Sequence, residues 1–151
     1  MVIKKIKTDD TIKEIYQFEK KTEIKRPLIG SEVPAGFPSP AQDYIENTLD
    51  LNEFLISHPV ATFFVKVEGY SMENAGIFPD DILIVDRAIE PVNNKIIIAV
   101  LDGELTVKRL KIENKRWFLV PENPQYETIE VTDEENFQVW GVVTFAIHKM
   151  K

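Results

Sequence analysis

The stretch KIIIAVLDGELTVKRLKI, residues 95–112, restricts the fold more than any other part of the chain. It contains two apolar runs joined by Asp102-Gly103, a dipeptide that strongly favours a tight β-hairpin turn. Similar short strand patterns occur at ATFFVKVEG, DDILIVDRA, RWFLV, ETIEV and FQVWGVVTFAI. The continuous apolar run in DDILIVDRA predicts a strand that is buried on both faces. The sequence therefore predicts a mainly β, antiparallel domain.

The first part of the chain has a different character. Residues 1–35 look like an arm, whose scattered apolar positions support at most a short, weak helix at residues 12–18. The next stretch, GSEVPAGFPSPAQ, holds three prolines and two glycines and favours an extended, exposed strip. DYIENTLDLNEFLISHP then predicts a helix or a pair of helical turns, with Asp50 as N-cap and Pro59 as its end.

Composition limits the class of protein. The 151 residues are enough for one domain with a sizeable core, and they include no cysteine, which excludes disulfides and thiol chemistry. Residues 36–151 hold 10 basic and 19 acidic residues, a balance of −9 within the total of −7, so we expect no direct, tight DNA binding by this body. No apolar run is long enough to span a membrane, and no signal core is visible. A cytoplasmic protein fits these features.

Most enzyme templates do not fit the chain. Only two histidines occur; His58 precedes a proline at a predicted helix end, where a capping or surface role is expected, and His148 is expected to be solvated in a Lys-rich tail. Two histidines without cysteine argue against a zinc site, and no phosphate-binding glycine motif occurs. Asp80, Asp81 and Asp86 are explained by a turn and a strand end. We therefore expect no metal and no cofactor.

A serine and a lysine are the remaining candidates for chemistry. Ser71 lies in GYSM, where a predicted strand stops, and is either a turn and helix-cap residue or a nucleophile. A neutral lysine can take the proton of a serine if burial lowers the lysine's pKa. Lys108 lies within a predicted strand and shares a face with Thr106 and Leu110. On spacing alone, the ordinary roles of cap and strand residue remain open beside the Ser-Lys pair.

These segments together resemble a known family. GYSM resembles the serine motif of the LexA/UmuD-type autopeptidases, and GELTVKRL resembles their lysine-bearing strand. AGFPSPAQDYIENTLDLNEFLISHP, GIFPDDILIVDRAI and FQVWGVVTFAIHKM resemble UmuD segments, in the same order, from about residue 35 to the end of the chain. The resemblance implies a LexA/signal-peptidase-like antiparallel β catalytic domain at residues 36–151, with an extended, cleavable arm at residues 1–35.

The resemblance also assigns roles to residues of this chain. It implies that Ser71 is the nucleophile, that Lys108 is the general base, and that the bond cut is Ala35–Gly36. It further implies that cutting is slow until the protein docks on a RecA–single-stranded DNA filament in the SOS response. The trimmed form would then be a homodimer that joins a UmuC-like Y-family DNA polymerase for error-prone synthesis across lesions.

Three other interpretations compete with this one. A LexA-type repressor would need a DNA-binding module before the cut, and residues 1–35 offer only one weak helical segment. A type I signal peptidase also pairs serine with lysine but would need a membrane anchor. A non-catalytic protein-binding module could use the same β surface without chemistry. Self-cleavage is the observation that separates the catalytic from the non-catalytic interpretations.

Overall fold

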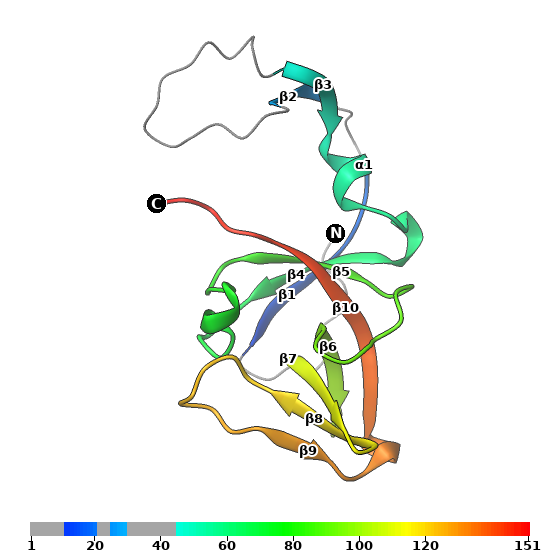
Figure 1. Cartoon of the computed structure of the whole chain (residues 1–151), viewed down its shortest axis with the longest axis vertical. Coiled ribbons are helices and arrows are strands. Elements are labelled where there is room, and N and C mark those ends of the chain that lie inside the picture. The colour runs from blue at the N-terminus through cyan, green and yellow to red at the C-terminus, as the bar shows by residue number, and fades with distance from the viewer. Residues whose placement is uncertain (1–10, 21–24, 30–44) are drawn as a thin grey trace. The chain divides into compact units, whose positions relative to one another are not determined.

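The computed structural model describes residues 11–20, 25–29 and 45–151 of the chain. The chain divides into two compact units, one formed by Met1–Phe18 with His58–Lys151 and the other by Glu19–Ser57. Figure 1 shows the strands of both units. The boundary predicted between residues 35 and 36 falls on residues outside the described ranges and stays a prediction.

The larger unit is built on one eight-stranded sheet. Its order is β1-β4-β5-β10-β6-β7-β8-β9, and the neighbouring strands pair antiparallel. The strands are β1 (Ile12–Gln17), β4 (Thr62–Val67), β5 (Ile82–Asp86), β6 (Ile96–Leu101), β7 (Glu104–Glu113), β8 (Arg116–Val120), β9 (Ile129–Val131) and β10 (Phe137–Ile147). The predicted antiparallel β architecture is confirmed.

The turns follow from the sequence. Asp102 and Gly103 connect β6 to β7 with φ angles of 51° and 79°, the positive values that a tight hairpin turn requires. Asn114 and Lys115 connect β7 to β8 in the same region of φ, at 51° and 64°. The apolar run of DDILIVDRA forms β5, which lies between β4 and β10 and is buried from Leu83 onward, as predicted.

The sheet has apolar side chains in two core clusters, and consecutive residues alternate between them. In β6, Ile98 belongs to the first cluster, while Ile97 and Ala99 belong to the second. In β7, Val107 lies in the first cluster and Leu110 in the second. This alternation confirms that Val107 and Leu110 face opposite ways, with Lys108 on the Leu110 side of the strand.

The weak helix predicted at residues 12–18 is wrong, because this segment forms β1 at one end of the sheet order. A bulge between Ile12 and Glu14 shifts the register against β4. The extra residue turns Ile12 and Ile15 to the same side, and both are buried in the first core cluster. Their spacing of three, which suggests a helix, is here the spacing of a bulged strand.

The smaller unit contains the antiparallel pair β2 (Lys25–Ile29) and β3 (Ile45–Asp50), followed by the short helix α1 (Leu51–Leu55). Asp50 is the N-cap of α1, as predicted, since its Oδ1 accepts a hydrogen bond of 3.0 Å from the Asn52 amide. The helical prediction is wrong for residues 45–50, because pairing with β2 overrides their weak helical pattern. The predicted extended strip lies outside the described residues. None of the helices in the described ranges is long and apolar enough to cross a membrane.

Candidate active site

Ser71 lies in the turn that follows β4. Gly69 has a φ of 76°, a left-handed conformation that glycine adopts without strain, and it redirects the chain directly before the serine. A short 3-10 helix follows at Glu73–Ala75, and its N-cap is Met72, with no side-chain capping bond. Ser71 therefore does not cap this helix. Its exposed fraction is only 3%, so Ser71 is buried within this turn.

The loop that contains Glu122 and Asn123 supports the serine turn. The Asn123 side chain is buried and donates a hydrogen bond of 2.9 Å from Nδ2 to the Tyr70 carbonyl oxygen. The Asn74 amide donates another, also of 2.9 Å, to the Glu122 carbonyl. These bonds fix the backbone on both sides of Ser71. Sequence reasoning missed Asn123, whose only signal is its place before a proline in a turn-rich segment.

Lys108 lies within β7 and is 5% exposed. Its Nζ donates hydrogen bonds to Thr106 Oγ1 at 2.7 Å and to the Val107 carbonyl oxygen at 3.0 Å. The partner residue across the hairpin is Ile97, which is fully buried. Apolar surroundings disfavour the charged form of an amine.

Thr11 connects the serine segment to the lysine strand. Its carbonyl oxygen accepts a hydrogen bond of 2.9 Å from the amide of Glu68, three residues before Ser71. Its Oγ1 accepts a bond of 3.1 Å from the amide of Val107, the residue before Lys108. The residue directly before GYSM and the residue directly before Lys108 are thus both bonded to this one buried threonine. No sequence signal pointed to Thr11, because it belongs to the stretch that was assigned to an arm.

The two histidines pair with buried aspartates. His58 Nδ1 lies 2.6 Å from Asp86 Oδ2, and His148 Nδ1 lies 2.6 Å from Asp81 Oδ1. The prediction that His148 is solvated is only partly right: its side chain is 44% exposed, but it pairs with Asp81. His58 is the N-cap of a short 3-10 helix but makes no side-chain capping bond. Among the described residues, neither histidine is hydrogen-bonded to Ser71, so no Ser-His pair is formed.

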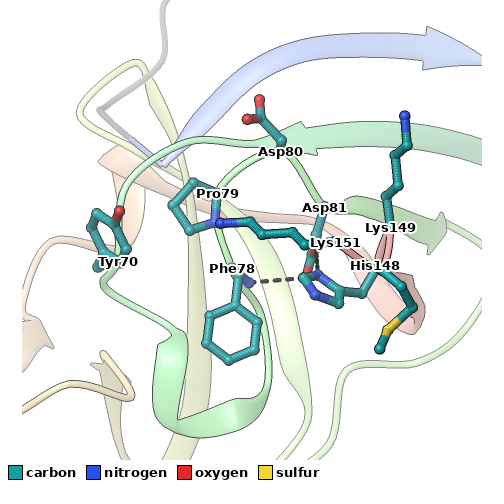
Figure 2. Close-up of a pocket in the computed structure, with 9 residues that line it drawn as sticks. Tyr70, Phe78, Pro79, Asp80, Asp81, His148, Lys149 and Lys151 are labelled. Atoms are coloured by element: carbon teal, nitrogen blue, oxygen red, sulfur yellow. Dashed lines mark hydrogen bonds and ion pairs between the residues drawn. The ribbon is translucent and has the colours of Figure 1, made fainter.

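A cavity of about 740 Å³ lies beside the serine turn. Figure 2 shows its lining, in which Asp81 and His148 point toward one another. Asp81 Oδ2 also accepts a hydrogen bond of 2.9 Å from the Phe78 amide, and the Phe78 ring lies 5.5 Å from the His148 ring. Asp80 has a φ of 71°, which fits the predicted turn. These acidic residues therefore shape a turn and a cavity wall.

The predicted cleavage site, Ala35–Gly36, lies outside the described part of the chain and stays a prediction. Within residues 11–20, 25–29 and 45–151, no three histidine, aspartate or glutamate side chains gather in a way that could hold a metal ion.

Comparison with known proteins identifies the family. The peptidase S24-like family matches residues 27–144 of the chain. Protein SamA of Salmonella typhimurium strain LT2 is 48% identical over 125 residues, which cover 83% of this chain and 86% of SamA. Protein ImpA of Escherichia coli is 46% identical over 127 residues, with the same coverage. Protein MucA of Escherichia coli is 39% identical over 122 residues, which cover 80% of this chain and 83% of MucA.

The chain belongs to the peptidase S24-like family. Within that family, the similarity to SamA, ImpA and MucA confirms the UmuD-like resemblance that the sequence motifs indicated. The chain is a UmuD-like protein of SOS mutagenesis, in a family whose members cleave themselves. The family match begins at residue 27, before the point at about residue 35 where the motif resemblance begins.

Proposed function

We propose that the chain cuts itself once, between Ala35 and Gly36, with Ser71 as nucleophile and Lys108 as general base. The observation that carries the proposal is the burial of both side chains in segments that share hydrogen bonds to Thr11. A buried hydroxyl and a buried amine, on segments that are both hydrogen-bonded to Thr11, support this pairing, which requires the two groups to come within hydrogen-bond reach of each other.

The chemistry balances with these two groups. Neutral Lys108 takes the proton of Ser71 Oγ while Oγ attacks the carbonyl carbon of Ala35. The bond between Ala35 and Gly36 then breaks, and the ammonium group of Lys108 returns the proton to the leaving amine of Gly36. Ala35 is left as an ester on Ser71. Water, deprotonated by Lys108, attacks this ester, the ammonium group of Lys108 returns the proton to Ser71 Oγ, and residues 1–35 are left with a free carboxylate at Ala35.

The proposed scissile bond lies between the two paired strands of the smaller unit. β2 ends at Ile29 and β3 begins at Ile45, and the two strands pair antiparallel. The scissile bond therefore lies in a connection whose ends are held side by side. Because substrate and peptidase share one chain, the reaction depends on effective concentration rather than on affinity.

The proposal has a regulated part. Cutting is slow in isolation and is stimulated by a RecA–single-stranded DNA filament, and the trimmed chain acts in the cytoplasm as a homodimeric subunit with a UmuC-like Y-family polymerase. The similarity to SamA, ImpA and MucA supports this part. A filament speeds cutting if it favours the conformation in which the scissile bond occupies the site.

Intact mass after incubation of the purified chain tests the proposal. We expect two fragments that meet at residues 35 and 36, formed slowly alone and faster with RecA filaments. An uncut chain under both conditions would contradict the peptidase and favour a binding module. Cutting that filaments leave unchanged would contradict only the regulated part.

Removal of the Asn123 side chain is expected to slow the cut by about three- to tenfold, because the Tyr70 carbonyl loses its buried donor and the serine turn is released. Asn123→Ala and Asn123→Asp both lack the donor, and fragment formation measures their rates. Asn136→Ala is the matched control, since Asn136 donates to Asp133 in an exposed loop. Equal rates in Asn123→Ala, Asn136→Ala and the parent chain would show that the turn needs no such support.

A further inference from the structure

β1 lies on the N-terminal side of the proposed cut, although it is part of the large sheet. The inference below rests on the proposed cleavage position. Cutting between residues 35 and 36 places β1 in the N-terminal fragment and β4, its neighbour, in the remaining body. The fate of β1 after the cut therefore depends on its non-covalent contacts alone.

Hydrogen bonds hold this segment at both ends as well as along its length. Thr11 accepts bonds from the amides of Glu68 and Val107 at its start. The Phe18 amide donates a bond of 3.2 Å to the Thr62 carbonyl at its end. Between these points β1 pairs antiparallel with β4. Residues 11–18 therefore fill a defined site, made of the β4 edge and the Val107 amide, which we call the β1 site.

The side chains match this site in shape. Ile12 and Ile15 are 2% and 6% exposed and share a core cluster with Val65 and Val67 of β4. Departure of β1 would expose these four side chains to water, which costs free energy in proportion to their apolar area. The Phe18 ring adds an edge-to-face contact, with its centroid 5.8 Å from that of Phe64.

The charged residues of β1 also lie near residues of opposite charge. Glu14 lies opposite Lys66 in the register of the two strands. Lys13 Nζ lies 3.5 Å from Asp80 Oδ1. Opposite charges at cross-strand positions add a small stabilisation and select the register. The β1 site thus favours an extended segment with apolar residues at the Ile12 and Ile15 positions and this order of charges.

The released fragment contains a second paired strand. β2 lies before the cut and β3 after it, and their pairing also crosses the two products. Two strand pairings therefore oppose the departure of residues 1–35.

We propose that cleavage does not by itself remove β1: residues 11–18 remain bound in the β1 site as a non-covalent strand after the cut. The cut converts β1 from a fixed part of the sheet into an exchangeable ligand. The β1 site is thus a binding site for an extended peptide strand, and its occupant after the cut is the chain's own residues 11–18.

A cut that does not depend on Ser71 tests this inference separately from the proposed function. A recognition sequence for a site-specific protease is placed between residues 35 and 36 of a Ser71→Ala chain, and the added protease makes the cut. We expect residues 1–35 to co-elute with the body on gel filtration in buffer and to separate in denaturant. We also expect the amides of residues 12–17 to keep their protection from hydrogen exchange after the cut.

Matched alanine variants show whether the β1 site holds the fragment. Ile15→Ala removes a buried side chain and is expected to speed release of residues 1–35 by about thirtyfold or more, whereas Gln17→Ala changes an exposed position on the same strand and leaves release unchanged. A labelled peptide of residues 11–20 is expected to exchange into the cut protein, and the same peptide with Ile15→Asp is not. Loss of protection in β1 upon cutting, or separation of the fragment in plain buffer, would overturn the inference.

Discussion

Ser71→Ala and Lys108→Ala are each expected to reduce self-cleavage by about a thousandfold or more, to the limit of detection. The serine supplies the oxygen that attacks Ala35, and the lysine supplies the only base that the proposed site uses. Removal of one member of a catalytic pair that acts as a unit typically costs as much as removal of the whole unit. The rate of formation of residues 36–151, followed by intact mass, measures the effect.

Loss of folding must be separated from loss of chemistry in these variants. Lys108→Met keeps an unbranched side chain of similar length at this buried position of β7, opposite Ile97, while the amine is removed. Ser57→Ala and Lys111→Ala are matched controls at an exposed serine and at another lysine of β7. A Lys108→Met chain that still cuts itself at the parent rate would show that another group is the base.

The histidines give a further comparison. His58 and His148 are the two histidines of the chain, the residue type that most often acts as a general base in enzymes, and each pairs with a buried aspartate. We therefore expect His58→Asn and His148→Asn to cut at close to the parent rate. A loss in either variant comparable with that in Lys108→Met would make that histidine part of the site.

The strands and turns could be read from the sequence because their signals are local. Asp102-Gly103 specifies its turn through the positive φ angles of both residues. The apolar run of β5 indicates a central strand because both of its faces are covered: Leu83 and Val85 lie in the first core cluster, and Ile84 on the other face is only 1% exposed. Lys108 could also be placed correctly, since alternation along β7 determines which neighbours share its face.

The sequence does not reveal features that depend on contacts distant along the chain. Ile12 and Ile15 have helical spacing, and only the bulge against β4 makes them neighbours on one face of a strand. Thr11 lies 96 residues before Val107, to which it is hydrogen-bonded, so no local pattern could indicate its place between the two motifs. Asn123 lies 53 residues after Tyr70, to which it is hydrogen-bonded. A single sequence carries little information on such pairs.

The candidate site was predicted through motif order rather than through physics alone. A serine after a strand and a lysine within a strand each have common structural roles, and their burial is not visible in the sequence. In the structure neither residue has its common role. Met72, not Ser71, is the N-cap of the 3-10 helix, and Lys108 is buried rather than at a solvated edge. Both differences favour the chemical role.

The rate of self-cleavage is expected to rise with pH, by about tenfold per unit while Lys108 is mostly protonated, and then to level off. The sign follows from the mechanism, because only the neutral amine can accept the Ser71 proton, and higher pH increases the neutral fraction. A rise over three pH units would thus reach about a thousandfold. Fragment formation across a pH series measures the profile, with the Ser71→Ala chain showing by circular dichroism where the fold is retained.

Lys108→Arg separates deprotonation of Lys108 from a general effect of alkali on the protein. Arginine stays charged across the whole range, so this variant should remain uncut at every pH at which the parent chain accelerates. A flat profile in the parent chain would contradict a lysine base, and a profile that levels off near pH 6.5 would indicate a histidine instead. Lys108 is buried in β7, and its Nζ is held by hydrogen bonds to Thr106 and Val107, so a change of charge on this amine does not require the side chain to move from solvent. The pH profile of the parent chain and its loss in Lys108→Arg therefore test the same buried group.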